Sequence, residues 1–144
     1  MLPPSDSAPD PFAAVASKLL AGTGDAPNVA GCVLRAVDEL TRHLTPLIGE
    51  IGVRALLSRS AARSAARYPW LAGAIPIIKP ADAPWASLRT AFNNQDRRTA
   101  IEGFGALLSA FVELFQRLIG KVLVAQLMHE LWPDVFPQPD KETT

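Results

Sequence analysis

The sequence contains a single cysteine, Cys32, and no excess of charge of either sign. One cysteine excludes an internal disulfide, which fits a reducing compartment, and the apolar neighbours of Cys32 indicate a small buried side chain. The chain carries fourteen basic and fourteen acidic residues, whereas a nucleic-acid-binding domain usually has a basic excess. We therefore expect a cytoplasmic protein that does not bind nucleic acid.

The motifs of catalysis and cofactor binding are also missing. The chain has no G-x-S-x-G turn, and Gly22-Thr23-Gly24 lacks the lysine and hydroxyl residue that complete a phosphate-binding loop. His43 and His129 form no recognisable metal-ligand set with nearby His, Cys or Asp. These absences predict a protein that is not an enzyme and that holds no metal or cofactor.

Long uninterrupted apolar runs are absent as well. The first ten residues, MLPPSDSAPD, have neither a cationic start nor an apolar run, so we expect no secretory signal. Residues 103–128 are long enough to span a membrane, but Glu113, Arg117 and Lys121 interrupt them. Each such charge costs about 2.5–3.5 kcal/mol at the bilayer centre, so we predict a buried helix and no transmembrane segment.

The apolar residues that are present, 49% of the chain, recur with the period of a helix, and no strand pair is recognisable. This pattern predicts an all-α fold: a compact bundle of about five helices in a single domain over 12–132. We expect flexible tails over 1–11 and 133–144. The expected helices cover 11–21, Asp25 to Pro46, 47–66, 84–92 and a long C-terminal helix over 97–131 capped by Asp96. Residues 69–84, with four prolines, predict an ordered loop.

One stretch of about twenty residues occurs twice, 71 positions apart. Residues 46–57 read PLIGEIGVRALL and residues 117–128 read RLIGKVLVAQLM, so Gly49 corresponds to Gly120 and Glu50 to Lys121. The similarity is either a chance match of two apolar helices or a structural pseudo-repeat. The pseudo-repeat predicts that two helices cross closely at the glycines, with Glu50 facing Lys121.

The C-terminal helix has more apolar surface than one neighbouring helix covers. Phe104, Phe111, Phe115 and Leu118 lie along one line on the helix surface, which we name the seam. With the apolar residues beside the seam, the apolar face covers more than half of the helix circumference. Such a helix lies at the centre of a bundle or against a second chain, and closed two-fold dimers are the commonest oligomers. We therefore predict a non-enzymatic bacterial regulatory or signalling module that binds proteins and forms a homodimer through this helix. The candidate residues for a helix crossing or for the interface are Gly49, Glu50, Gly120, Lys121, Phe104, Phe111, Phe115 and Leu118.

Three arginines, Arg59, Arg63 and Arg67, are spaced four residues apart and form one ridge on a helix. The ridge is either a solvated face or a site for an acidic protein partner or an anionic membrane surface. Another alternative is a sensor that holds an apolar ligand or haem inside the bundle. The lining of that cavity would include Phe104, Phe111, Phe115 and Met128.

Small and very large side chains give two further expectations. Gly103 and Gly105 fall inside a helical pattern and predict the close approach of another helix. Trp70, Trp85 and Trp132 each lie beside a proline at the end of an expected element, and we interpret them as buried plugs at the ends of the bundle rather than exposed partner anchors.

Overall fold

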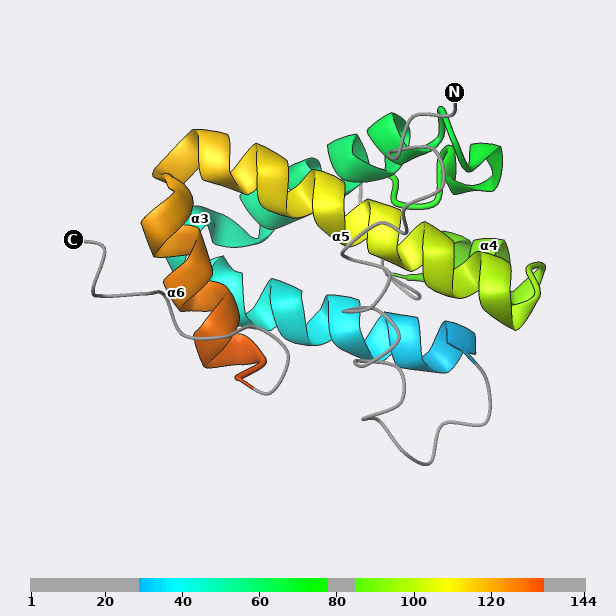
Figure 1. The fold of residues 1–144 in the computed structure, drawn as a ribbon, viewed down its shortest axis with the longest axis horizontal. Helices are drawn as coiled ribbons and strands as arrows, with labels where there is room; N and C mark the ends of the chain where they lie inside the picture. Colours follow the sequence, from blue (N-terminus) through cyan, green and yellow to red (C-terminus); the bar gives the residue numbers. More distant parts are fainter. Residues whose placement is uncertain (1–28, 78–84, 134–144) are drawn as a thin grey trace, which may run out of the picture.

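The computed structural model describes residues 29–77 and 85–133, and within these ranges every regular element is a helix (Figure 1). The elements are α3 (Val29–Ser64), the 3₁₀ helix η1 (Pro69–Leu71), α4 (Ala86–Asn93), α5 (Arg97–Ile119) and α6 (Lys121–Leu131). The all-α prediction is therefore confirmed for the described part of the chain. The helix expected over 11–21, the helix start at Asp25 and the two tails fall outside the described residues, apart from Pro133.

Helix α3 consists of two arms joined at Gly49, not at Pro46 as predicted. The helix continues through Pro46, whose side chain is exposed. Gly49 has φ 82° and ψ 155°, a conformation that is essentially restricted to glycine. The chain therefore bends at the nearest residue that can reach this conformation, three positions after the proline.

The predicted long C-terminal helix is likewise divided, so the expectation of one continuous helix over 97–131 is wrong. Helix α5 begins at the predicted cap, where the side chain of Asp96 accepts a hydrogen bond of 2.8 Å from the Thr99 amide. It ends at Ile119, because Gly120 has φ 95° and ψ 156°. Helix α6 then runs to Leu131, immediately before Trp132 and the predicted stop at Pro133.

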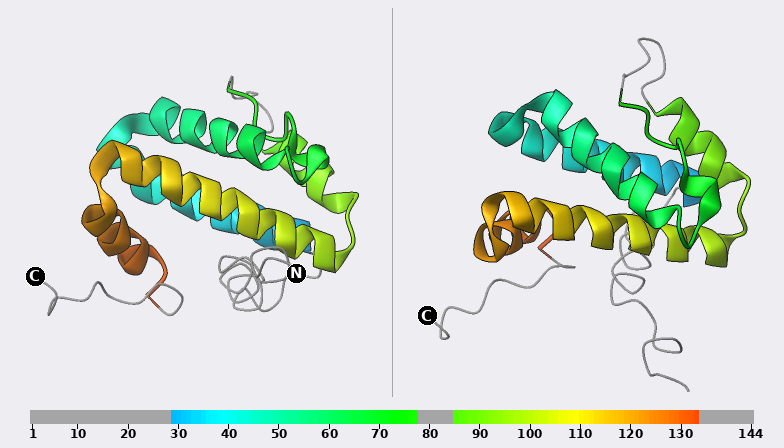
Figure 2. Two further views of the ribbon diagram at one scale, coloured as in Figure 1. Left: turned by 45° about the horizontal axis from the view of Figure 1, so that its top comes forward. Right: turned by 90° about the horizontal axis from the view of Figure 1, so that it is seen from above.

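The first arm of α3 and helix α5 start at one end of the molecule, and both lead to a glycine bend at the other end (Figures 1 and 2). The second arm of α3 returns from Gly49 toward the starting end, whereas α6 runs from Gly120 across the bend end toward the first arm of α3 (Figure 1). Helix α4 and η1 close the end that lies opposite the two bends (Figure 1). The largest fully buried side chains include Phe92, Phe104, Phe111, Phe115, Leu40, Leu44, Leu57 and Leu71.

An aromatic cluster fills the closed end of the bundle. Trp70 meets Phe92 edge to face at a centroid distance of 4.9 Å, and Phe92 meets Phe104 in the same manner at 6.4 Å. A Cβ atom at Gly103 would overlap the ring of Trp70. The predicted close approach at Gly103 is therefore made by an indole ring and not by another helix.

The three tryptophans differ in burial. Trp132 is buried, as predicted for a plug, and its Nε1 donates a hydrogen bond of 3.2 Å to Glu39. Trp70 is partly buried at the closed end, and Trp85 is partly buried beside α3. None of the three is a fully exposed anchor.

Candidate interaction surface

The sequence repeat corresponds to a repeat of structure. We name residues 30–61 the first unit and residues 101–132 the second unit. The two glycines have nearly the same backbone conformation, φ 82° and ψ 155° at Gly49 against φ 95° and ψ 156° at Gly120. Positions 71 residues apart are also buried in both units, as in the pairs Val33 and Phe104, Leu40 and Phe111, Leu44 and Phe115, Val53 and Val124, and Leu57 and Met128. Each unit thus contains two helices joined by a glycine bend.

The predicted helix crossing at the two glycines is wrong. Gly49 and Gly120 are exposed, and a Cβ atom built on either one has no neighbouring atom within 4 Å. The physical reason is the positive φ angle, which takes each glycine out of its helix and into a bend at the surface. These glycines change the direction of the chain and do not admit a neighbouring helix.

The bends carry most of the large exposed apolar side chains of the described residues. We name residues 47–52 the first joint and residues 118–123 the second joint. The exposed fractions are 53% for Leu47 and 83% for Ile51 in the first joint, and 60% for Leu118, 71% for Val122 and 42% for Leu123 in the second. In the described ranges the only other large exposed apolar side chain is Ile77.

Both joints lie at the same end of the molecule, as all three ribbon views show (Figures 1 and 2). We name their exposed side chains the end surface: Leu47, Glu50, Ile51, Leu118, Lys121, Val122 and Leu123. Leu47 corresponds to Leu118 and Ile51 to Val122 in the repeat. The end surface is therefore built twice from similar apolar residues, with one acidic and one basic residue at equivalent positions.

The predicted helix-crossing and interface residues separate into two groups. Phe104, Phe111 and Phe115 are buried in the core of their own chain, which is the central position that the sequence offered as one of two alternatives for this helix. Helix α3 and helix α6 cover the seam on which they lie. Gly49, Glu50, Leu118, Gly120 and Lys121 are all exposed at the joints.

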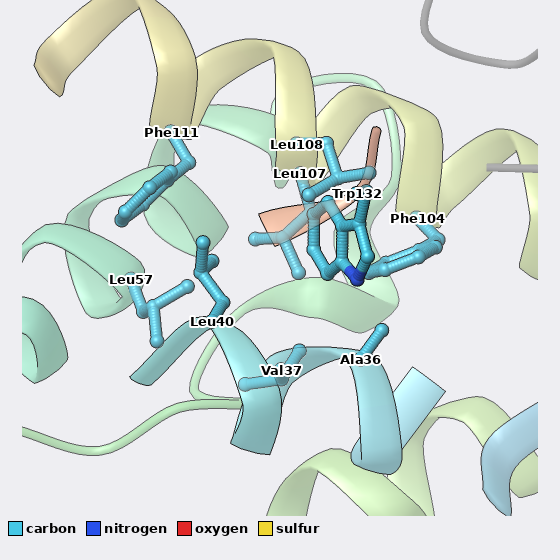
Figure 3. A pocket seen from close by; sticks show the side chains of 9 residues that line it. All are labelled: Ala36, Val37, Leu40, Leu57, Phe104, Leu107, Leu108, Phe111 and Trp132. Atoms are coloured by element: carbon cyan, nitrogen blue, oxygen red, sulfur yellow. The ribbon is translucent and has the colours of Figure 1, made fainter. Parts of the chain in front are cut away.

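The centre of the bundle is filled by side chains (Figure 3). A small gap beside Leu40, Phe104 and Phe111 leaves no room for a water molecule. In Figure 3 the indole of Trp132 points into this region between α3 and α5. The apolar ligand or haem considered above would have to displace these side chains, and the arrangement does not favour it.

The arginine ridge lies on the second arm of α3, and its three side chains are exposed. Arg63 is paired with Glu113 of α5, with 2.7 Å between Nη2 and Oε1. The Arg67 guanidinium lies 5.4 Å from the ring centre of Tyr68. The middle of the ridge therefore holds two helices together, and Arg59 and Arg67 are the members that a partner could reach without breaking an ion pair between helices.

The role of a further arginine, Arg54, was not recognised in the sequence. Its side chain is buried, Nε donates a hydrogen bond of 2.7 Å to the Pro76 carbonyl, and the guanidinium lies 4.9 Å from the ring centre of Trp85. Burial lowers the pKa of Arg54, and the charge of Glu50 one turn earlier partly offsets this effect. Arg54 thus fixes the proline-rich segment against α3, a long-range contact that has no local sequence signal.

A shallow groove of about 370 Å³ lies beside this contact. It is lined by Asp38, Thr41, Arg42, Thr45, Pro46, Glu50 and Trp85. Asp38 and Arg42 form an ion pair of 2.8 Å across one turn, and Trp85 Nε1 lies 3.5 Å from Asp38. These groups satisfy one another.

Within the part of the chain that is described, no three His, Cys, Asp or Glu side chains come together in a way that would hold a metal ion. No helix within residues 29–77 and 85–133 is both long and apolar enough to cross a membrane. Comparison with protein-family models, curated proteins and solved structures found no match.

Proposed function

We propose that this protein is a non-enzymatic helical regulatory module that acts by binding protein surfaces, and that it forms a homodimer through the end surface. The observation that carries the proposal is the exposure of large apolar side chains at equivalent positions of both joints. Single exposed apolar residues are ordinary in folded proteins. A group of them at one end of a molecule is typical of an interaction site.

The end surface offers enough apolar area for association. Full burial of one such side chain contributes about 1.5–3 kcal/mol. Five of them on each copy together reach the range of about 4–15 kcal/mol that association costs in lost freedom of movement. The dimer contact expected along the C-terminal helix is therefore moved to the joints, because the middle of that helix is already covered.

A second copy is a suitable partner because both sides would present the same apolar chemistry. A two-fold interface requires one patch that is complementary to itself. The repeat supplies two similar halves within one patch, since Leu47 and Ile51 of the first joint match Leu118 and Val122 of the second. Cys32 is buried and forms no disulfide, which is compatible with the cytoplasmic location expected from the sequence.

Sedimentation equilibrium of the full chain over a wide concentration range tests the proposal. The wild type is expected to reach the mass of a dimer, and the double variant Ile51→Ser/Val122→Ser is expected to remain a monomer. Ile77→Ser is the matched control, because Ile77 is 65% exposed but belongs to neither joint. A wild-type protein that is monomeric at every concentration, or a double variant that dimerises as strongly as the control, would overturn the proposal.

An acidic protein partner on the arginine ridge is the second candidate. It is favoured by the exposure of Arg59 and Arg67 and by the absence of any acidic residue between Ile51 and Ala81. Reversal of both arginines to Glu is expected to leave the dimer unchanged. It should abolish capture by polyglutamate beads at low salt, and retention of the double variant on those beads would remove this candidate.

A further inference from the structure

We infer that two copies dock crosswise, so that the first joint of each copy lies on the second joint of the other and Glu50 faces Lys121 of the second copy. This inference rests on the proposed function, because it specifies how the end surface meets its partner. It also gives Glu50 and Lys121 a role between copies, namely the choice between two possible dimers.

The apolar contacts alone do not distinguish these two dimers. A two-fold axis can bring like joints together or can bring unlike joints together. Because the joints share their backbone bend and their apolar residues, Leu47 and Ile51 can meet either their own equivalents or Leu118 and Val122. The buried apolar surface is similar in both arrangements.

The charges do distinguish them. Glu50 and Lys121 occupy equivalent positions, and both side chains are exposed. Like joints would place Glu50 opposite Glu50 and Lys121 opposite Lys121, two repulsive contacts. Unlike joints place each Glu50 opposite a Lys121, two attractive contacts.

The residues around the two positions increase this difference. Arg117 is exposed at the start of the second joint, and its equivalent in the first joint is the uncharged Pro46. Arg54, one turn after Glu50, is buried and senses the charge of Glu50, whereas the Glu50 side chain itself is exposed. The second joint is therefore basic at its surface, and the first joint presents a carboxylate.

Cysteine cross-linking tests the crosswise arrangement. In a Cys32→Ala background, Glu50→Cys and Lys121→Cys are prepared as separate proteins, one of them with a terminal tag, and treated with a short bismaleimide alone and as an equimolar mixture. The crosswise dimer predicts a covalent product only in the mixture, and that product contains one tagged and one untagged chain. A control protein with Ile77→Cys is expected to give no product in any combination.

The other outcomes separate the two proposals. Products formed by each single variant alone would show that like joints meet, which overturns the crosswise arrangement and leaves the proposed function in place. If the wild type sediments as a dimer and no combination is cross-linked, the crosswise arrangement is again overturned and the proposed function stays in place. A wild type that stays monomeric in sedimentation equilibrium overturns the proposed function, and with it the crosswise arrangement.

Discussion

The first and second units bury side chains at many equivalent positions but differ in the charges that they expose. Equivalent core positions are buried in both, and Gly49 and Gly120 differ by little in φ and ψ. At the surface of the joints, Glu50 is replaced by Lys121. The shared burial is explained by the fold, and the change of charge at the exposed position is the feature that the proposed crosswise dimer uses.

The units also differ in how their second arms are held. The second arm of α3 is fixed by Arg54 against Pro76 and by Arg63 against Glu113. Helix α6 is held by the Trp132 hydrogen bond to Glu39, and His43 Nε2 lies 3.7 Å from Glu130. The second arm of the first unit is thus held by charged contacts, and the second arm of the second unit is held largely by the buried indole of Trp132.

The largest effect is expected where the units agree, in the shared core. Phe111→Ala should lower the free energy of unfolding by about 3–5 kcal/mol and Leu40→Ala, at the equivalent position, by about 2–5 kcal/mol, because each leaves a cavity among fully buried side chains. Chemical denaturation measures both. Leu118→Ala is the control, because Leu118 is exposed and leaves no cavity. If Leu118→Ala lowers the free energy of unfolding as much as Phe111→Ala, the Leu118 side chain belongs to the core and not to the surface.

The glycine bends should respond equally in the two units. Gly49→Ala and Gly120→Ala are each expected to destabilise the fold by about 1–3 kcal/mol, because an L side chain is strained at these angles. Gly52→Ala is the matched control inside a helix. A Cβ there would lie 3.4 Å from the Ile48 Cβ, and loss of the glycine should stabilise the helix by about 0.5–1 kcal/mol. Stabilisation by all three alanines in thermal melts would mean that the bends are not fixed.

Gly103 marks a position where the units differ. Its equivalent in the first unit is Cys32, a buried side chain, whereas a Cβ at Gly103 would overlap Trp70. Gly103→Ala is expected to destabilise the fold by about 1–3 kcal/mol through overpacking. In urea titrations the second substitution Trp70→Leu should recover part of this loss. A neutral Gly103→Ala would show that the indole moves away without cost.

The smallest effect concerns the start of α5 and depends on pH. Hydrogen bonds from Thr99 hold the pKa of Asp96 below its ordinary value of 3.8. Because the folded-state pKa is lowered, this contribution to stability is complete above the unfolded-state pKa and is lost as the pH falls through the folded-state pKa. Asp96→Asn keeps a capping side chain without a titrating group. The difference in melting temperature between wild type and Asp96→Asn should therefore change only in acid, and a constant difference would contradict the role of the charge.

The sequence predicted the helical class, the Asp96 cap and the end of the last helix, because each depends on residues close together in the chain. It did not predict the bends, since a glycine inside an apolar helical pattern is compatible with a continuous helix. Only the structure shows their positive φ angles. The contacts of Arg54 with Pro76 and Trp85 join distant segments and could not be predicted from local pattern. Among the candidate residues, Gly49, Glu50, Leu118, Gly120 and Lys121 are exposed at the joints, whereas Phe104, Phe111 and Phe115 are in the core, and the sequence alone did not decide between core and interface for these three.

Charge reversal at the joints tests most directly whether their opposite charges meet between copies. Sedimentation equilibrium is measured for Glu50→Lys alone, for Lys121→Glu alone and for their equimolar mixture. Each single variant places like charges opposite one another in the crosswise dimer, so we expect dimerisation to weaken at least about tenfold, which corresponds to about 1.4 kcal/mol. The mixture pairs opposite charges again and should dimerise as the wild type does. Single variants that dimerise as strongly as the wild type would contradict the account.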